Sequence, residues 1–374
     1  MSSSRYSSDD HRYMARALEL AARGLYTTDP NPRVGCVIVR DGRVIGDGWH
    51  RARGGPHAEV EALAQAGDRA AGATAYVTLE PCCHHGKTPP CTDALIAAGV
   101  ARVVAAMEDP NPRVGGRGLA TLRAAGIQTE CGLLAAAAEV LNPGFCSRMQ
   151  AGKPLLRSKL AMSLDGRTAL ASGESRWITG ESARRDVHHW RARSSAIVTG
   201  IGTVLADDPG LTARLGGDEE VLQPVRVVLD SRLHLPIDAQ LLRLPGRTVV
   251  VTVTDDAERI HALTVAGAEI RLLEPDAASG RVGLAGLIRC LGELEFNEVW
   301  FEAGPTLNGA LLQSGLIDEW IIYMAPCVLG DAARGLFNLG VLESMEQRYD
   351  LHLVETRQVG RDLRLRLSRQ AATA

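Results

Sequence analysis

Aromatic residues are scarce in this chain, since Phe, Trp and Tyr make up only 4% of its 374 residues. A hydrophobic core must therefore come mainly from Val, Leu, Ile and Ala, which fill parallel sheets that are covered by helices. An excess of one charge is also lacking, because 41 Lys and Arg stand against 44 Asp and Glu, for a net charge of −3. This balance argues against a nucleic-acid binder that depends on a basic surface.

Membrane and export signals are lacking as well. No apolar run reaches the length of a membrane span, and the first ten residues, MSSSRYSSDD, have no apolar core of the kind that signal peptides carry. The eight cysteines therefore predict free thiols or metal ligands in a reducing cytosol rather than disulfides. The length of the chain suggests two domains or one large one.

The N-terminal half alternates between helical and extended patterns. Apolar residues at helical spacing predict a helix over 14–25, and residues 35–49 predict two strands around the turn Asp41-Gly42. Further elements are expected in the order helix 57–66, strand 74–79, helix 93–98, strand 102–107 and helix 118–125. This rhythm is typical of a layered α/β domain.

The string DPNPRVG occurs twice in this half, at 29–35 and at 109–115. The flanking residues differ, so the two copies do not indicate a repeat architecture. One interpretation is two Asn-Pro turns of similar chemistry. The other is that both loops line the same site.

The pattern breaks between residues 142 and 154, and we therefore place two domains at 1–150 and 151–374. The second domain again predicts α/β structure, with two antiparallel strands that close the sheet at 351–359 and 364–367. Its other strands are expected at 155–163, 196–200, 224–230, 248–254, 268–274, 298–304 and 319–325.

A set of His and Cys residues in the first domain predicts a zinc site. His57, Cys82 and Cys91 are ligand types that Zn²⁺ prefers, and three protein ligands leave a fourth position open for water, as in catalytic sites. Glu59 lies two residues after His57 and can act as a proton shuttle, as in zinc nucleobase deaminases. A closed Cys/His zinc site or plain buried cysteines are the alternatives.

Two features of the second domain indicate nucleotide and phosphate binding. The sequence FEAGPTLNG places a helix start at Pro305, directly after a strand that ends at Glu302, and a helix start binds phosphate well. An ordinary strand–helix turn is the alternative. Arg191 and Arg214 are candidate phosphate anchors, because a guanidinium matches phosphate with two hydrogen bonds, although either arginine can equally be a surface charge.

Longer motifs in both halves resemble one known family, the bifunctional riboflavin-biosynthesis deaminase–reductases. In the first half they are HAE at 57–59, TLEPCCHHGKTPPCTDALIAAGV at 78–100 and MEDPNPRVGGRG at 107–118. The eight residues between Cys82 and Cys91 exceed the common P-C-x-x-C spacing, but this long insert is typical of the family. The resemblance implies a cytidine-deaminase-like α/β/α domain that holds one Zn²⁺.

The resemblance also assigns roles to residues of the first half. It implies zinc ligation by His57, Cys82 and Cys91, proton transfer by Glu59 and contact with the substrate base by Asn31. An Asn-Pro turn residue is an equally plausible role for Asn31. Two neighbours stay without an assigned role. Cys83 stands where the family more often has Ser, and His50 either touches the substrate phosphate or only caps a strand.

The second half resembles the reductase domain of the same family, which has a dihydrofolate-reductase-like fold. The matching motifs are KLAMSLDGRTA, SGESRWITG, IVTGIGTVLADDPGLTAR, VVLDSRLHLP and FEAGPTLNGALL. The resemblance implies that NADPH contacts Ala161, Trp177, Thr203, Asp207, Ser231, Gly304, Pro305, Thr306, Leu307, Asn308, Gly309 and Ala310. It implies that substrate contacts Ser175, Arg191, Leu211, Arg214, Glu302 and Lys159, the last as an electrostatic or proton-donating residue. Cys327 departs from the family, which often has Lys there.

The activity expected from this resemblance has two steps in riboflavin synthesis. The first half removes the 2-amino group of a diamino-phosphoribosylaminopyrimidine, and the second half uses NADPH to reduce the ribosyl chain to a ribityl chain. The expected partner is a small phosphorylated pyrimidine in the cytoplasm, without nucleic acid or membrane. Homo-oligomers are also expected, because family members commonly assemble through the reductase domain.

Three alternatives remain open at this point. The first is a tRNA or nucleobase deaminase with an unrelated second domain. The second is a non-catalytic zinc protein that senses nucleotides. The third is a reductase whose deaminase half is only a scaffold for dimerisation. The preference for NADPH over NADH is also open, and Ser231-Arg232 is the best candidate for binding the 2′-phosphate of NADPH.

Overall fold

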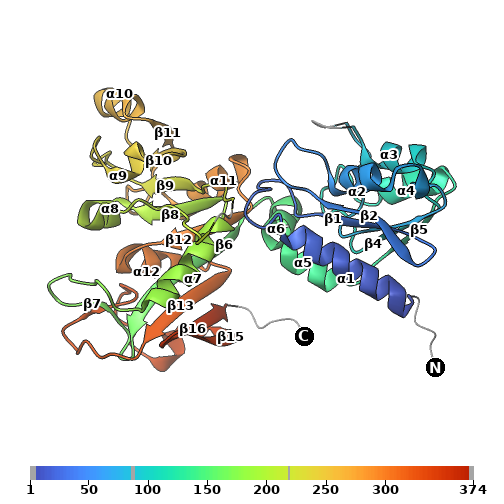
Figure 1. Ribbon diagram of the computed structural model, residues 1–374. Helices are drawn as coiled ribbons and strands as arrows, with labels where there is room; N and C mark the ends of the chain where they lie inside the picture. The colour runs from blue at the N-terminus through green and yellow to red at the C-terminus, as the bar shows by residue number, and fades with distance from the viewer. Residues whose placement is uncertain (1–5, 86–88, 218–219, 370–374) are drawn as a thin grey trace. The chain divides into compact units, whose positions relative to one another are not determined.

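The computed structural model describes residues 6–85, 89–217 and 220–369. The chain forms two compact units that meet between Gly152 and Lys153, and each is described separately (Figure 1). Both units are α/β structures in which helices cover a central sheet, and the predicted fold class is therefore confirmed. Within the described part of the chain, no helix has the length and apolar character that crossing a bilayer requires.

The sheet of the N-terminal unit has five strands in the order β2-β1-β3-β4-β5. Strand β1 is antiparallel to both of its neighbours, β2 and β3. Strands β3, β4 and β5 run parallel to one another. Strand β5 has no buried side chain and was not predicted. The strands are β1 Gly35–Arg40, β2 Arg43–Trp49, β3 Thr74–Val77, β4 Arg102–Ala105 and β5 Gln128–Cys131.

Helices cover both faces of this sheet because both faces are apolar. Ile38 of β1 packs with α2, α3 and α4, whereas its neighbours in the strand pack with α1, α5 and α6. Glycines let the helices approach closely, since a Cβ at Gly35 would lie 2.0 Å from the carbonyl oxygen of Ala17. The helices are α1 Ser8–Ala22, α2 Ala58–Ala66, a 3-10 turn at Gly67–Ala70, α3 Cys91–Ala97, α4 Arg117–Ala124, α5 Ala135–Leu141 and α6 Pro143–Ala151.

Helix α6 occupies the segment where the sequence pattern appeared to break. Its start follows a known rule, because Pro143 takes the first helical position, where a missing N–H costs nothing. The preceding Asn142 is the N-cap residue, but its side chain makes no capping hydrogen bond to the helix. Its side chain instead accepts from the backbone N–H of Arg33 at 2.8 Å and donates to the carbonyl oxygen of Arg33 at 3.0 Å. Asn142 therefore ties the end of the first DPNPRVG loop to the helix layer.

The sheet of the C-terminal unit has nine strands in the order β11-β10-β9-β8-β12-β6-β13-β16-β15. The seven strands from β11 to β13 are parallel, and the last two strands are antiparallel, as predicted. The strands are β6 Leu155–Ser163, β8 Ala196–Gly200, β9 Val225–Leu229, β10 Thr248–Thr252, β11 Ala268–Leu272, β12 Glu298–Glu302, β13 Glu319–Ala325, β15 His352–Val359 and β16 Asp362–Ser368; a separate pair joins β7 Arg167–Ala169 to β14 Arg334–Gly335.

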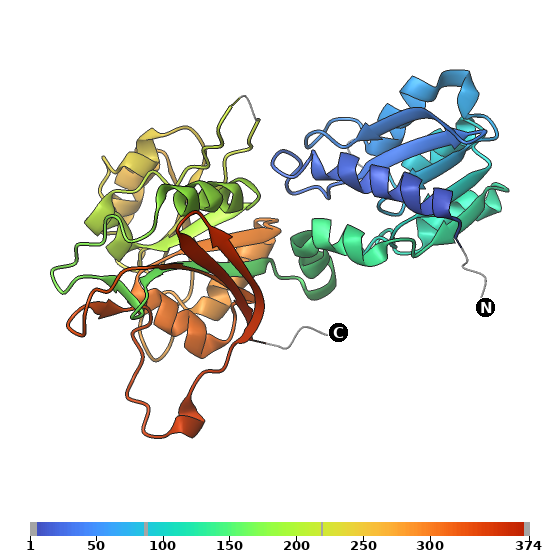
Figure 2. The same ribbon diagram turned by 60° about the horizontal axis from the view of Figure 1, so that its bottom comes forward.

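Helices again cover both faces of the second sheet (Figure 2). Val198 and Val249 face α11 and α12, whereas Ile197 and Val250 face the layer of α7 to α10. This alternation comes from strands with apolar residues at successive positions, as expected for parallel sheets. The helices are α7 Glu181–Ala192, α8 Ile201–Asp207, α9 Gln240–Arg243, α10 Ala257–Val265, α11 Leu284–Glu293, α12 Pro305–Ser314 and a 3-10 turn at Met345–Gln347.

Candidate metal centre and nucleotide-binding cavity

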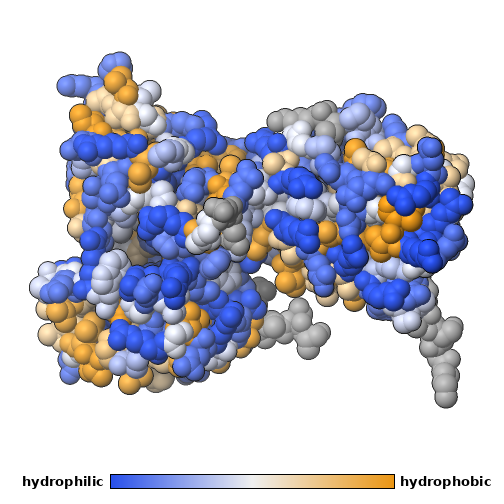
Figure 3. All heavy atoms as spheres, viewed as in Figure 1, coloured by the Kyte–Doolittle hydropathy of each residue, from blue (hydrophilic) through white to orange (hydrophobic). Residues whose placement is uncertain are grey.

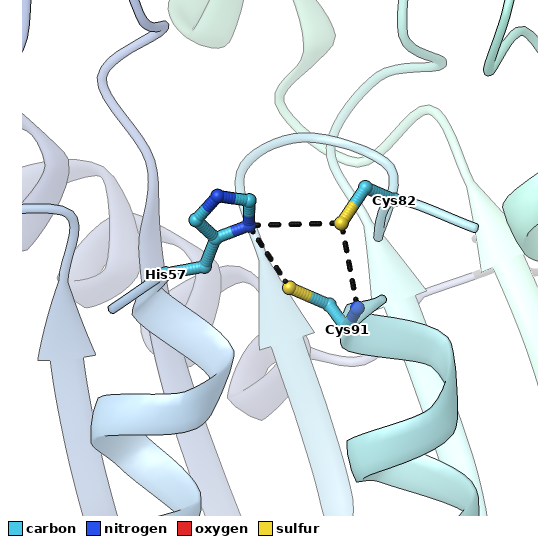
Figure 4. Close-up of side chains that lie close together, drawn as sticks. All are labelled: His57, Cys82 and Cys91. Atoms are coloured by element: carbon cyan, nitrogen blue, oxygen red, sulfur yellow. Dashed lines mark hydrogen bonds between the residues drawn. The ribbon is translucent and has the colours of Figure 1, made fainter. Parts of the chain in front are cut away.

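Three potential metal ligands converge beyond the end of β3 in the N-terminal unit (Figure 4). His57 directly precedes α2, Cys82 lies in the loop after β3, and Cys91 is the first residue of α3. Their ligand atoms all lie within 4.8 Å of one another. The Nδ1 atom of His57 is 3.1 Å from Sγ of Cys91 and 3.6 Å from Sγ of Cys82.

These distances fit a single zinc ion. Zn–S bonds of about 2.3 Å and Zn–N bonds of about 2.0 Å at tetrahedral angles separate the nitrogen and sulfur atoms by roughly 3.5 Å. The low pKa of the Cys82 thiol also suits a cation. Hydrogen bonding from the Cys91 thiol, together with His57 and the backbone N–H of Cys91, lowers the pKa of Cys82 to about 4 against the effect of burial. The hydrogen bond to Cys82, and next burial, raise the pKa of the Cys91 thiol, so this ligand would release its proton when a metal ion binds.

Glu59 lies beside this cluster without belonging to it. It is the second residue of α2 and is only 3% exposed. Burial, and next the nearby Cys82, raise the pKa of its carboxyl group to about 7. A carboxyl group with a pKa near neutrality can both accept and release a proton during a reaction.

Asn31 is connected to the metal-ligand cluster through His50. The Nδ1 atom of His50 lies 2.9 Å from the carbonyl oxygen of Pro56, which can only accept, so Nδ1 carries the proton. Its Nε2 atom is then an acceptor for the amide of Asn31 at 3.0 Å. The rings of His50 and His57 stand edge to face, with centroids 5.4 Å apart. The sequence left His50 without a role, and the structure makes it the link between Asn31 and the metal cluster.

Glu80 is a positioning residue that sequence reasoning missed. Its buried carboxylate accepts the backbone N–H groups of Asp109 at 3.1 Å, Gly116 at 2.8 Å and Leu119 at 3.0 Å. Because Glu80 is followed by Pro81-Cys82, it fixes the second DPNPRVG loop next to a metal ligand. The structure thus favours the interpretation that the two copies of this string belong to one site.

A cavity of about 1740 Å³ lies in the C-terminal unit, at the carboxyl ends of β8, β9 and β12. Figure 3 shows the surface of this unit hollowed, with hydrophilic side chains around the opening. Most residues that the sequence assigned to the cofactor line the cavity, namely Ala161, Trp177, Thr203, Asp207, Ser231, Gly304, Pro305, Thr306, Leu307, Asn308 and Ala310. All residues that it assigned to the reductase substrate do so too, namely Lys159, Ser175, Arg191, Leu211, Arg214 and Glu302.

The turn before α12 has the form expected of a phosphate site. Gly304 caps the helix, Pro305 takes its first position, and a Cβ at Gly304 would meet no protein atom within 4 Å. The unpaired N–H groups of the first turn therefore border open space. Asn308 braces the turn, because its amide donates to the carbonyl oxygen of Ala303 at 2.8 Å and accepts from the hydroxyl of Ser158 at 2.8 Å.

Gly309 is predicted to contact the cofactor, and the structure shows a tight packing contact at this residue. It does not border the cavity, and a Cβ at this position would lie 2.2 Å from the carbonyl oxygen of Asn338. Glycine is required there because the backbone of Asn338 packs directly against α12. The sequence could not separate this packing role from a contact with the cofactor, since both need glycine in the same motif.

The structure also separates the two arginines that the sequence treated alike. Arg191 lines the cavity and pairs with Glu302, because its Nε and Nη2 atoms lie 2.6 and 2.7 Å from the two carboxylate oxygens of that residue. Its Nη1 donates to the carbonyl oxygen of Thr212 at 3.0 Å. Arg214, by contrast, is exposed, and its guanidinium contacts Thr212 Oγ1 at 2.9 Å and His188 at 3.2 Å.

Glu302 and Lys159 are two further charged groups of this cavity. Burial opposes ionisation of Glu302, but Arg191 and, more weakly, Lys159 lower its pKa to about 2. Burial lowers the pKa of Lys159, which Glu302 partly offsets. The two side chains come from the neighbouring parallel strands β12 and β6, where Glu302 and Lys159 are direct partners in the register.

Comparisons with known proteins agree with both sites. A family model described as the cytidine and deoxycytidylate deaminase zinc-binding region matches residues 7–107, and one described as the RibD C-terminal domain matches 154–365. The chain is 51% identical over 368 residues to the riboflavin biosynthesis protein RibD of Escherichia coli (strain K12), covering 96% of this chain and 99% of that protein.

Solved structures show the same likeness. The structure of Acinetobacter baumannii RibD (form 1) superposes with a TM-score of 0.89 at 48% identity, covering 96% of this chain and 98% of the other. A structure from Thermotoga maritima, described as a diaminohydroxyphosphoribosylaminopyrimidine deaminase/5-amino-6-(5-phosphoribosylamino)uracil reductase, gives a TM-score of 0.84 at 34% identity, with coverage of 96% and 98%.

Proposed function

We propose how this chain, which belongs to the RibD family of riboflavin biosynthesis proteins and is a bifunctional deaminase and reductase, divides its work between its two halves. Residues 1–150 are the zinc-dependent pyrimidine deaminase, and residues 151–374 are the NADPH-dependent reductase. The substrate of the first step is 2,5-diamino-6-(5-phosphoribosylamino)pyrimidin-4-one. The product of the second step is 5-amino-6-(5-phosphoribitylamino)uracil.

In the deaminase half, His57, Cys82 and Cys91 are the residues that would hold the zinc ion. The bound ion supplies Lewis-acid chemistry that makes water nucleophilic at neutral pH. Glu59 accepts a proton from the water that attacks C2 and delivers it to the leaving amine, so that a carbonyl group and ammonia are formed. Asn31, oriented by His50, contacts the pyrimidine base.

In the reductase half, bound NADPH would supply a hydride to C1′ of the opened ribosyl chain. The turn from Gly304 to Ala310 binds the cofactor phosphates, except that Gly309 serves in packing. Lys159, the register partner of Glu302, would give a proton to the nitrogen bound to C1′, so that the C1′=N bond of the opened chain becomes a single bond. Arg214 binds the substrate phosphate, and this binding energy helps to position the sugar.

One observation carries this assignment. A single chain contains both a three-ligand cluster with a buried glutamate beside it and, in a different compact unit, a cavity lined by the reductase motifs. A nucleobase deaminase with an unrelated second domain would not need that cavity. A non-catalytic zinc protein would not need Glu59 buried with a raised pKa.

Purified full-length enzyme given the diaminopyrimidine substrate tests the proposal. We expect ammonia release without NADPH, followed by NADPH oxidation when the cofactor is added. Glu59→Gln should lower ammonia release at least 100-fold while zinc content and NADPH oxidation on the deaminated product remain. Glu61→Gln, two residues along the same helix, is the matched control. Intact ammonia release in Glu59→Gln would refute the proposed role of Glu59.

The proposal also includes the cellular compartment of the enzyme and its oligomeric state. None of the eight cysteines, all of which lie in the described residues, forms a disulfide, which supports a reducing, cytosolic setting. The partner is a small phosphorylated pyrimidine. Homo-oligomers form through the reductase half, and light scattering coupled to size-exclusion chromatography measures their size directly. A strictly monomeric enzyme that is fully active would contradict this part of the proposal.

A further inference from the structure

Trp177 is the most exposed of the five tryptophans, with 68% of its surface accessible, and it lines the reductase cavity. Trp190, Trp300 and Trp320, by contrast, are buried. An exposed aromatic ring at the wall of a cavity is a candidate ligand contact. The resemblance assigned Trp177 to NADPH, but an exposed side chain exchanges between rotamers unless a neighbour fixes it.

Arg184 lies against this ring. It belongs to the first turn of α7, and its guanidinium carbon is 4.6 Å from the ring centre of Trp177, which is the geometry of a cation–π contact. Nη1 of Arg184 also donates to the carbonyl oxygen of Thr179 at 2.8 Å. Because a guanidinium is planar and this hydrogen bond limits its motion, Arg184 offers the indole a fixed surface. All three residues line the cavity.

Arg176 attaches the other end of the same segment. Its Nη2 donates to the carbonyl oxygen of Asp207 at 3.2 Å and lies 3.5 Å from Oδ1 of that residue. Asp207 is the last residue of α8, where unpaired carbonyl groups favour a positive charge. The segment 176–179 is therefore held by α8 at one end and by α7 at the other, and Trp177 lies between the two attachments.

The contacts of Arg184 differ from those of its neighbour in α7. Within the part of the chain that the structure describes, Arg184 forms no ion pair, whereas Arg185 contacts the carboxylate of Glu181 at 3.1 Å. Arg184 instead contacts the indole of Trp177 and the backbone of Thr179, both of which border the cavity. A direct contact with a phosphate is the alternative role for this arginine, and binding measurements separate the two.

We propose that Arg184 is a positioning residue for the cofactor, which holds the indole of Trp177 in the orientation in which the ring packs against bound NADPH. The inference rests on the proposed function, because it takes NADPH as the ligand of this cavity. It extends that function, since no motif of the sequence gave Arg184 a role. Helix α7 thereby supports cofactor binding as well as Glu302, which Arg191 of the same helix contacts.

Calorimetry of NADPH binding to the full-length enzyme tests the role of Arg184 without any turnover. For Arg184→Gln, we expect the Kd for NADPH to rise about fivefold, because the indole loses its cationic support. At saturating NADPH, the KM for the deaminated phosphoribosyl substrate should stay within about twofold of the wild-type value. Arg185→Gln, at an exposed position of the same helix, is the matched control and should bind NADPH as the wild-type enzyme does.

A double-mutant cycle shows whether Arg184 acts through Trp177. Trp177→Ala alone should also weaken NADPH binding. Once the indole is absent, the further change Arg184→Gln should alter the Kd by less than about twofold, because the guanidinium then has no ring to hold. An Arg184→Gln effect of the same size in both backgrounds would overturn the inference, and so would an unchanged Kd in the single variant.

A contact between Arg184 and a substrate phosphate would give a different result. The KM for the phosphoribosyl substrate would then rise while the Kd for NADPH stayed the same, and this outcome too would overturn the inference. If Arg184→Gln does not fold, Arg184→Met, which keeps the apolar stem without the charge, takes its place with the same expected rise in Kd. Failure of the proposed function looks different, since the wild-type enzyme itself would then not bind NADPH.

Discussion

The indole N–H of Trp300 donates a hydrogen bond of 2.8 Å to Oε1 of Glu302, the same oxygen that Arg191 contacts through Nε at 2.6 Å. Trp300 is fully buried and stacks on Trp190 at 5.5 Å with nearly parallel rings. A residue that never faces the cavity thus determines where the carboxylate of Glu302 points. Trp300 is therefore a positioning residue for the reductase site.

Replacing Trp300 by Phe should affect only the reductase reaction. The ring is retained for stacking, but the hydrogen bond to Glu302 is lost, so we expect kcat/KM for NADPH oxidation to fall about 10-fold. Ammonia release by the deaminase half should not change. The buried Trp320, which packs in a different core cluster, provides the control Trp320→Phe. Equal losses of reductase activity in both variants would show a general packing effect instead.

Removal of zinc should separate the two activities. The ligand cluster lies in the N-terminal unit, so a chelator is expected to abolish ammonia release while NADPH oxidation on the deaminated product continues. Cys82→Ser and Cys91→Ser should each reduce bound zinc to less than about one tenth per chain, because thiolates supply two of the three protein ligands. Metal analysis by mass spectrometry measures this directly.

Cys83 is the matched control for the zinc ligands. It is adjacent to Cys82 but does not belong to the cluster, and burial raises the pKa of its thiol. Cys83→Ser should therefore keep a full complement of zinc and normal ammonia release. Loss of zinc in this variant would mean that Cys83, rather than its neighbour, binds the metal.

Arg232 should determine the preference between the two nicotinamide cofactors. Both Ser231 and Arg232 line the cavity, and the hydroxyl of Ser231 accepts from the backbone N–H of Val282 at 3.0 Å, which fixes this segment. Arg232→Ala is expected to weaken NADPH binding about 10-fold and NADH binding less than twofold, since only NADPH carries the 2′-phosphate. Calorimetry measures both. Equal weakening of the two cofactors would reject the assignment.

The pH dependence of the free energy of unfolding should show the contribution of Asp10, which connects α1 to the N-terminal sheet. Its carboxylate accepts from the Tyr76 hydroxyl at 2.7 Å and from Arg102 at 2.7 Å. Although burial opposes ionisation, Arg102 and Tyr76 hold the pKa of Asp10 well below its usual range. A lowered pKa in the folded state stabilises the protein above about pH 4, and that contribution is lost as the pH falls further.

Asp10→Asn should therefore lower the free energy of unfolding by about 2–3 kcal/mol at pH 7, because Arg102 loses a buried partner. The difference between variant and wild type should shrink between pH 5 and pH 2. Urea unfolding of zinc-loaded protein at several pH values measures it. Asp9→Asn, at an exposed position in the same helical turn, is the control. A difference that stays constant with pH would contradict the assignment.

Local patterns predicted most elements and the metal ligands, because those depend on residues close in sequence. His57 and Glu59 share one helix start, and Cys82 and Cys91 bracket one loop. The pairing of Arg191 with Glu302 was out of reach, since the two are 111 residues apart and meet only because β12 lies beside β8 in the sheet. The sequence therefore gave no sign that Arg191 pairs with Glu302.

Other features of the structure were not predicted from the sequence, and each has a physical reason. Helix α6 was hidden because Asn-Pro-Gly usually marks a turn, yet here it starts a helix at Pro143. Glu80 acts through backbone N–H groups of a distant loop, and no side-chain pattern signals such contacts. The close packing of Gly309 against Asn338 likewise depends on the tertiary fold.

Strand β6 is the first strand of the C-terminal unit in the chain, yet it lies inside the sheet between β12 and β13. Its two neighbours, β12 and β13, are the last of the parallel strands in the sequence, and both begin more than 130 residues after the end of β6. On a ribosome, the N-terminal unit can complete its core while β6 still waits for its partners. Because such distant pairings slow folding, synthesis should yield a finished deaminase before a finished reductase, and truncated chains should keep the first activity alone.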